Sequence, residues 1–282
     1  GDNYGGDSSS VSSDLSSGVS SIVGAKYAFA ALKEDGSVVT WGFGSNSSDH
    51  SNFGGDSSSV ASSLSSGVSS IVSAGEAFAA LKADGSVVTW GDADYGGNSS
   101  SVASRLTSDV TSIVGNNSAF AAIKADGSVV TWGESYVGGD SSSVASSLSS
   151  GVSSIVSTGL AFVALKDDGS VVLWGHHNNL AENSWVASTL TNFRSIAGND
   201  QVLAAIKADG SVTTWGFAVG GNMEGFANSG GETLGVDLSG GVSSIIGTGS
   251  AFAAIKADGS VVTWGGDNYG GDSSSVSSDL SS

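Results

Sequence analysis

Six copies of one short motif run along this chain of 282 residues. Each copy of Asp-Gly-Ser-Val is followed by a Trp-Gly pair, and successive pairs lie 41 to 49 residues apart. The Trp residues of these pairs are Trp41, Trp90, Trp132, Trp174, Trp215 and Trp264. A period of this length is typical of propeller blades or helical solenoids and is long for a β-helix coil. The chain is therefore a series of repeats, spanning approximately residues 1–42, 43–91, 92–133, 134–175, 176–216 and 217–265.

Three short apolar runs in each repeat predict β-strands. In the third repeat they are residues 110–114, 119–124 and 128–132, each rich in Val, Ile, Phe or Trp and bounded by Gly, Asn or Asp. Asp126 and Gly127 separate the second run from the third, and an Asp-Gly pair between apolar runs predicts a hairpin turn with positive φ at both residues. The second and third runs are therefore expected to form an antiparallel hairpin.

The second run of each repeat is apolar on both of its faces. In the second repeat, Ala77, Ala79 and Leu81 point to one side of the strand, and Phe78 and Ala80 point to the other. Both sides of the sheet must then be covered, as they are when small sheets stack around an axis. We expect an all-β fold, a β-propeller of six small antiparallel blades of about 42–49 residues each, in a single domain over residues 1–282. A count of seven blades is the alternative.

A Ser-rich segment precedes the first strand of each repeat. In the second repeat, Asp56 or a following Ser can cap a helical turn, and Val60 and Leu64 then lie on one face at i and i+4. Because so much Ser weakens helix propensity, an irregular clamp is the alternative.

Composition excludes several classes of function. The chain has 9 basic and 27 acidic residues, a formal net charge of −18, so nucleic acid and anionic membranes are poor partners. It has no Cys, which excludes disulfides, thiolate zinc sites and a cysteine nucleophile. No apolar run approaches the roughly 20 residues that a membrane-spanning helix needs, so we expect no membrane insertion.

The order of these elements resembles the regulator of chromosome condensation repeat. A unit of that family contains a Tyr-Gly turn, a Val/Ile strand followed by a Gly, an apolar strand, and an Asp-Gly pair followed by a strand that ends in Trp-Gly. In the third repeat, these four parts correspond in order to residues 92–97, 113–115, 119–123 and 126–133. The chain is also similar to tandem repeats of large cyanobacterial surface proteins. The resemblance implies a propeller, although members of the family usually have seven blades with longer units, and Pro is absent here.

The founding member's roles are not expected to carry over with the fold. That protein is a nucleotide exchange factor that binds chromatin, and chromatin binding needs a basic patch. This chain has only two Arg, Arg105 and Arg194. We therefore expect neither role.

The two ends of the chain carry the same sequence. Residues 1–17 recur letter for letter as residues 266–282, a partial repeat. One copy could close a ring, the second copy could begin a seventh blade completed by another chain or by further residues, or the chain could be a window of a longer array. Self-association, end to end or by exchange of a partial blade, is therefore a hypothesis with a basis in the sequence.

Six Lys residues recur two positions before the turn Asp. They are Lys33, Lys82, Lys124, Lys166, Lys207 and Lys256. We interpret each Lys as offsetting a neighbouring Asp at the edge of its blade. A collar that binds an anion or a partner is the alternative.

Candidate metal ligands are few. Asp92 and Asp94 are weak candidates for calcium, because turn chemistry explains carboxylates at such positions without an ion. His50, His176 and His177 lack a companion Cys or a Glu at helical spacing, so we expect no zinc site. With no cofactor and no recognisable catalytic set, we expect a protein that is not an enzyme.

Three regions depart from the repeat, at residues 43–53, 176–185 and 217–235, and insertions on one face often carry binding. The candidate ligand or partner residues in them are His50, Phe53, His176, His177, Trp185, Phe217, Met223 and Glu224. We expect a structural or adhesive module of a secreted or cell-surface protein, acting through protein contacts. A lectin-like propeller that binds glycans and an intracellular scaffold subunit are the alternatives.

Overall fold

The computed structural model of the chain describes residues 6–43, 52–176, 191–198, 202–216, 238–266, 270–276 and 280. These residues form six antiparallel sheets of three strands each, one sheet per repeat, in the order first, second, third strand. The prediction of an all-β fold with six blades is confirmed.

Blade 1 is β1 (Val19–Gly24), β2 (Ala28–Lys33) and β3 (Val38–Gly42); blade 2 is β4 (Val68–Ala74), β5 (Ala77–Lys82) and β6 (Val87–Gly91); blade 3 is β7 (Val110–Gly115), β8 (Ala119–Lys124) and β9 (Val129–Gly133). Blade 4 is β10 (Val152–Ser157), β11 (Ala161–Lys166) and β12 (Val171–Gly175); blade 5 is β13 (Phe193–Gly198), β14 (Val202–Lys207) and β15 (Val212–Gly216); blade 6 is β16 (Val242–Gly247), β17 (Ala251–Lys256) and β18 (Val261–Gly265).

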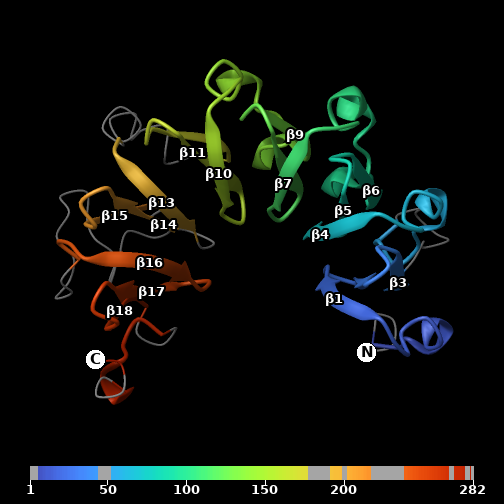
Figure 1. Cartoon of the computed structure of the whole chain (residues 1–282), viewed down its shortest axis with the longest axis horizontal. Helices are drawn as coiled ribbons and strands as arrows, with labels where there is room; N and C mark the ends of the chain where they lie inside the picture. The colour runs from blue at the N-terminus through green and yellow to red at the C-terminus, as the bar shows by residue number, and fades with distance from the viewer. Residues whose placement is uncertain are drawn as a thin grey trace. The chain divides into compact units, whose positions relative to one another are not determined.

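The chain divides into two compact units. The first contains residues 1–150 and 174–176, and the second contains residues 151–173 and 177–282. Blades 1, 2 and 3 follow one another side by side in the first unit (Figure 1). The expectation of a single domain stays a prediction.

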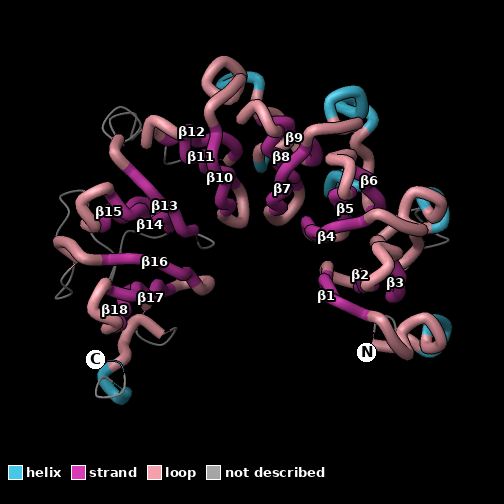
Figure 2. Tube along the Cα trace, viewed as in Figure 1, coloured by secondary structure: helices cyan, strands magenta, loops and turns pink. Residues whose placement is uncertain are grey.

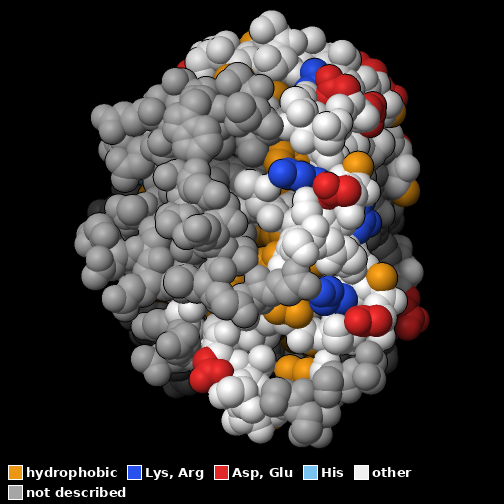
Figure 3. All heavy atoms as spheres, turned by 90° about the vertical axis from the view of Figure 1, so that its left-hand side faces the viewer, with side chains coloured by type: hydrophobic (Ala, Val, Ile, Leu, Met, Phe, Trp, Pro, Cys, Tyr) orange, Lys and Arg blue, Asp and Glu red, His pale blue; other side chains and the backbone are white. Residues whose placement is uncertain are grey.

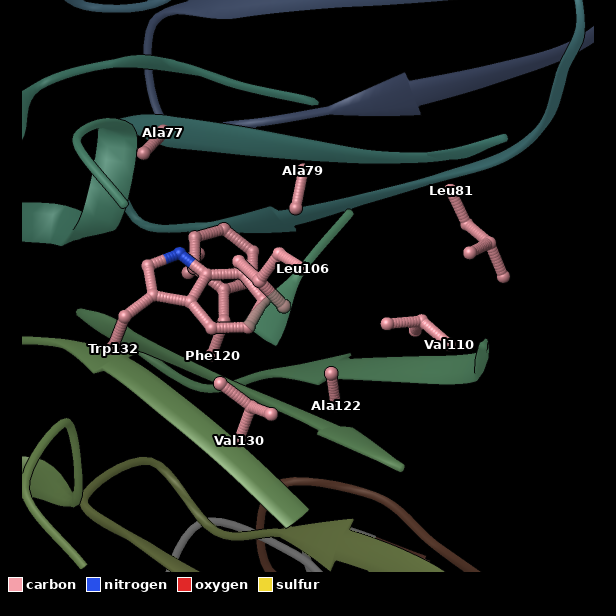
Figure 4. Packing of buried hydrophobic residues seen from close by; sticks show 10 residues of the cluster. Ala77, Ala79, Leu81, Leu106, Val110, Phe120, Ala122, Val130 and Trp132 are labelled. Atoms are coloured by element: carbon pink, nitrogen blue, oxygen red, sulfur yellow. The ribbon is translucent and has the colours of Figure 1, made fainter. Parts of the chain in front are cut away.

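The second strand of blades 2 to 5 is buried on both faces, as predicted. In β5, Ala77, Phe78, Ala79 and Ala80 are fully buried. The same arrangement in blade 3 brings Phe120 onto Trp132 at 5.2 Å between ring centroids and 17° between planes. Figure 4 shows this stack beneath the Ala side chains of blade 2. The small Ala residues therefore let the large rings of the next blade approach the sheet closely.

The hairpin between the second and third strands differs from the expectation. Lys33 donates its N–H to the carbonyl of Ser37 (2.9 Å), Gly36 donates to the carbonyl of Lys33 (2.9 Å), and Gly36 has φ of 76°. Among the described residues other than Gly, only Asp109 and Asn192 have positive φ, so the prediction of positive φ at the turn Asp is wrong. The pattern is that of a type I turn followed by a left-handed Gly. Asp35 instead accepts hydrogen bonds from the N–H (2.9 Å) and hydroxyl (2.6 Å) of Ser37.

In the first four repeats, the Ser-rich segment forms a short helical turn, as predicted. The turns in Ser-rich segments, drawn in cyan in Figure 2, are η2 (Ser9–Val11), η3 (Ser58–Val60), η5 (Ser100–Arg105), η7 (Ser142–Val144) and η9 (Ser274–Val276). Two further turns, η4 (Ala93–Gly97) and η6 (Ser135–Val137), lie in the linkers before the Ser-rich segments. Before η3, the carboxylate of Asp56 accepts the N–H of Ser58 at 2.9 Å. After η3, Leu64 is 2% exposed and anchors the segment in the core.

Backbone hydrogen bonds join neighbouring blades within a unit. The N–H of Val87 in β6 donates to the carbonyl of Leu106, which precedes blade 3, at 2.9 Å. The N–H of Val110, at the start of β7, donates to the carbonyl of Gly85 in the turn of blade 2 at 3.0 Å. The same two bonds recur between blades 1 and 2 and between blades 5 and 6.

Turn carboxylates predict a loss of stability in acid. The hydroxyl and then the N–H of the following Ser hold the pKa of each turn Asp below its usual value; these are Asp35, Asp84, Asp126, Asp168, Asp209 and Asp258. A pKa that is lower in the folded state means that the unfolded chain binds more protons in acid, so stability present above the unfolded pKa is lost as pH falls. We expect the Tm to fall as pH drops below about 5.

The comparison that isolates this effect uses a variant with all six turn Asp changed to Asn. Asn still accepts the Ser hydrogen bonds but does not titrate, so its Tm should depend less on pH in this range. Replacing carboxylates outside the turns, such as Asp14, Asp94 and Asp109, controls for the change in net charge. Equal acid slopes in the wild type and the six-fold variant would show that the turns do not cause the loss.

Candidate interaction surface

The three regions that depart from the repeat leave the same end of their respective blades. In blade 1, Gly24 pairs with Phe29 and Ala28 pairs with Gly42, so the turn between the first two strands and the exit of the third strand share one end. We call this end of a blade the linker face. The three regions follow β3, β12 and β15 in the sequence, and each of these strands ends on the linker face of its own blade.

Aromatic side chains gather on the linker face of blade 1. The ring of Phe53 lies 5.4 Å from that of Tyr27 and 5.0 Å from that of Phe43, edge to face in both pairs. Phe53 precedes Gly54 and Gly55, as Tyr95 precedes the Gly pair of the next linker. The structure thus places the candidate Phe53 in an aromatic cluster, half-buried, in the Tyr position of the repeat.

An ion pair lies next to this cluster. The Lys26 Nζ is 2.8 Å from Oε1 of Glu76, whose side chain is 7% exposed, and 4.7 Å from the centroid of the Tyr27 ring. The bond to Glu76, and then that to Tyr27, raises the pKa of Lys26. Our interpretation of the sequence missed this pair. The available signal was that Lys26 is the one Lys outside the recurring position.

His176 lies on the linker face with a partner that the sequence did not indicate. Its Nε2 is 3.0 Å from the hydroxyl of Tyr136, and the two ring centroids are 4.0 Å apart. Tyr136 is 57% exposed. The pair offers a flat ring with hydrogen-bonding groups at its edge, which suits contact with planar or polar groups of a partner. The other candidates, His50, His177, Trp185, Phe217, Met223 and Glu224, lie outside the described residues.

The candidate calcium residues serve the turn in which they lie. A carboxylate oxygen of Asp92 accepts the N–H of Asp94 at 2.8 Å, and Asp92 precedes the helical turn η4. Within the described ranges, no group of three or more His, Asp or Glu side chains is placed to hold a metal ion. Calcium at Asp92 and Asp94 stays a prediction.

Two of the recurring Lys residues, Lys33 and Lys82, bond to carbonyl groups. Lys33 Nζ donates to the carbonyl of Asp14 at 2.7 Å, and Lys82 Nζ donates to that of Ser63 at 2.8 Å. The ammonium groups of Lys33 and Lys82 thus tie the end of the Ser-rich segment to the second strand. Their charges also lower the pKa of the turn Asp, but less than the Ser hydrogen bonds do. The interpretation that these Lys residues act mainly by offsetting Asp missed this contact, because the partner is a backbone atom.

Charge on the described surface is dispersed. Figure 3 shows basic side chains lying singly, several of them beside an acidic side chain. Lys26–Glu76 is the one ion pair within 4 Å that the described residues contain. In the same part of the chain, no helix has the length and apolar character needed to span a bilayer.

Comparison with known proteins supports the fold. No protein-family model and no curated protein sequence matches the chain. Human WBSCR16 matches 88% of this chain and 76% of its own at 16% identity, with a TM-score of 0.55. Yeast RCC1 (Prp20), solved bound to Kap60, matches 89% of this chain and 70% of its own at 14% identity, with a TM-score of 0.50. The receptor kinase CR4 ectodomain of Physcomitrella patens matches 88% of this chain at 15% identity with a TM-score of 0.47, and the chain spans 61% of that protein. The chain therefore has the fold of an RCC1-like β-propeller.

Proposed function

We propose that this chain is a non-enzymatic protein-interaction module that acts through its linker face. The observation that carries the proposal is that residues outside the repeat pattern gather on that face. In the first unit, the Tyr136–His176 pair and the Lys26–Glu76 pair lie there, whereas the turns at the other end keep the same Asp-Gly-Ser motif. A constant scaffold with variable loops on one face is the usual arrangement of a binding repeat protein.

We further propose that the module belongs to a secreted or cell-surface protein with a structural or adhesive role. The acidic, Ser- and Gly-rich composition supports this location, as does the resemblance to tandem repeats of cyanobacterial surface proteins. Antibody labelling of the producing cells tests it. Label on intact cells supports a surface location, and label only after permeabilisation supports the intracellular scaffold instead.

Binding to the surface of those cells tests the role of the linker face. We expect the fluorescently labelled chain to bind, and Tyr136→Ala to weaken binding by about 5- to 30-fold, because an interface Tyr contributes roughly 1–2 kcal/mol. His176→Ala should weaken binding in the same direction.

Glu34→Ala, at the opposite end of blade 1, is the matched control and should leave binding unchanged. Treating the cells with protease or with periodate separates a protein partner from a glycan. Binding that is lost only with periodate would favour the lectin-like alternative, and binding that neither linker-face variant weakens would contradict the proposed surface.

A further inference from the structure

Each hairpin turn of this chain contains a dipeptide that is among the least durable in proteins. Asp-Gly occurs six times in the sequence, always between the second and third strands of a blade, and Ser follows it every time. In such a pair the backbone nitrogen of Gly can attack the side-chain carbonyl carbon (Cγ) of Asp, because Gly has no side chain to hinder the approach. The fold therefore places a reactive pair at one end of every blade.

The reaction of this pair needs only water. The nitrogen of Gly forms a bond to Cγ of Asp, a carboxyl oxygen leaves as water, and a succinimide ring results. Water then opens the ring at either carbonyl, which gives back Asp or yields isoaspartate, in which the chain runs through the side-chain carboxyl. The first step requires that the Gly nitrogen lose its proton, that it reach Cγ, and that the carboxyl be protonated so that water can leave.

The Gly nitrogen is held by a hydrogen bond within the turn. In blade 2, the N–H of Gly85 donates to the carbonyl of Lys82 at 2.9 Å. This bond stabilises the protonated nitrogen and fixes the plane of its peptide group, so it opposes attack on Cγ. The other five turns have the same bond to the Lys three positions earlier, at 2.8 to 3.0 Å, and its donors are Gly36, Gly127, Gly169, Gly210 and Gly259.

The carboxylate of Asp is held by the Ser that follows the Gly. Oδ1 of Asp84 accepts the N–H of Ser86 at 2.9 Å and its hydroxyl at 2.6 Å. The N–H bond is 2.9 Å long at all six turns. The hydroxyl bond is 2.5 to 2.6 Å long at the turns of Asp35, Asp168, Asp209 and Asp258 as well. These bonds restrain the Asp side chain, and they lower the pKa of Asp84, which makes the protonated form scarce at neutral pH.

Isoaspartate in a turn would disturb the junction between two blades. It would add one atom to the backbone path ahead of Gly85, whose carbonyl accepts the N–H of Val110 in the next blade at 3.0 Å. The space around Gly85 is also filled, since a Cβ placed on it would lie 2.6 Å from the backbone nitrogen of Asp109. The reactive pair therefore lies where the fold tolerates its product poorly.

The composition of the chain is consistent with selection for chemical durability. The sequence contains no Cys, a single Met and no Asn-Gly pair. Cys and Met are prone to oxidation. Asn in place of the turn Asp would accept the same hydrogen bonds. An Asn-Gly pair forms the succinimide more readily, however, because its neutral amide does not repel the attacking nitrogen as a carboxylate does. All six turns thus contain the acceptor that reacts more slowly.

We propose that the Ser of each Asp-Gly-Ser turn protects the chain from spontaneous formation of isoaspartate, by holding the Asp carboxylate in hydrogen bonds that the reaction must break. The motif then has two roles, because it shapes the hairpin and also slows the chemical ageing of the turn. This inference concerns the turn end of the blades and not the linker face. It therefore stands or falls independently of the proposed function.

Ageing of the full chain at neutral pH over several weeks tests the proposal. Trypsin cuts after Lys and Arg, which releases the six turns on six different peptides. Chromatography and fragmentation of each peptide give its fraction of isoaspartate. We expect every turn to form isoaspartate about 10-fold or more slowly in the folded chain than in the same chain unfolded in guanidinium chloride, because at least two hydrogen bonds must break.

Two variants of one turn isolate the role of the Ser hydroxyl. Ser86→Ala removes it and should raise the rate at Asp84 by about 3- to 10-fold. Ser86→Thr keeps a hydroxyl, is the matched control, and should react as the wild type does. The other five turns report on the fold and should keep their rates in both variants.

Three results would overturn the proposal. The first is an equal rate at Asp84 in Ser86→Ala and in the wild type. The second is a set of turns that react as fast in the folded chain as in the unfolded chain. The third is a faster reaction at all six turns of Ser86→Ala, because the cause would then be a loosened fold and not the lost hydroxyl.

Discussion

Replacing Gly97 with Ala is expected to lower the free energy of unfolding by about 2–4 kcal/mol. A Cβ on Gly97 would lie 2.3 Å from the carbonyl oxygen of Gly91, 2.4 Å from its carbonyl carbon and 2.7 Å from the oxygen of Asp92, all backbone atoms. No side chain can rotate to make room, so the linker must move away from the end of β6. That movement would also disturb the hydrogen bond from Trp132 Nε1 to the carbonyl of Gly96, at 3.1 Å.

Gly240→Ala is the matched control for this prediction. The nearest atom to a Cβ on Gly240 is the oxygen of Asp209 at 3.9 Å, an ordinary contact, and its φ is not in the left-handed region. We expect this variant to lie within about 1 kcal/mol of the wild type. Urea unfolding followed by Trp fluorescence gives both values. A Gly97→Ala variant as stable as Gly240→Ala would show that the Gly-Gly turn does not pack tightly on the strand end.

Phe120→Ala is expected to cost about 3–5 kcal/mol, the usual cost of removing a fully buried Phe. Phe120 is 0% exposed, stacks on Trp132, and lies beneath Gly96 and the Ala side chains of blade 2. The cavity would be lined partly by backbone and by Ala, which cannot extend to fill it. The same unfolding experiment measures the loss.

Phe29→Ala separates the role of burial from that of the aromatic stack. Phe29 stacks on Trp41 with the same geometry, 5.3 Å between ring centroids and 17° between ring planes, but Phe29 is only half-buried. We expect its removal to cost clearly less than that of Phe120. Equal costs would indicate that the stack itself, and not the packing of one blade on another, provides the stability.

The sequence predicted those parts of the fold that depend on residues close together in the chain. The run from Ala77 to Leu81 is apolar at every position, and this pattern predicts a strand that is covered on both sides. The structure buries this strand on both of its faces. The turn after it was placed correctly, but its type was not. Asp84 serves there as a hydrogen-bond acceptor for Ser86, and a short motif does not distinguish that role from positive φ.

The interaction surface was predicted less well because its contacts join distant residues. Lys26 and Glu76 are 50 positions apart, and Tyr136 and His176 are 40 apart. Neither pair has a local pattern, and each depends on how neighbouring repeats are placed. The end of the blade from which the variable loops leave could nonetheless be inferred, because that follows from the strand order alone.

The uniform way in which neighbouring blades pack has a consequence for how such a gene can change. Between blades 1 and 2 and between blades 2 and 3, Ala residues on one side meet a Phe–Trp stack on the other, and two backbone hydrogen bonds that do not depend on side-chain identity join the blades. Units that share this pattern can therefore sit beside one another without a redesigned core. Duplication, loss or shuffling of whole units by recombination would alter the length of the protein and its set of loops, while each new junction would be chemically the same as the old ones.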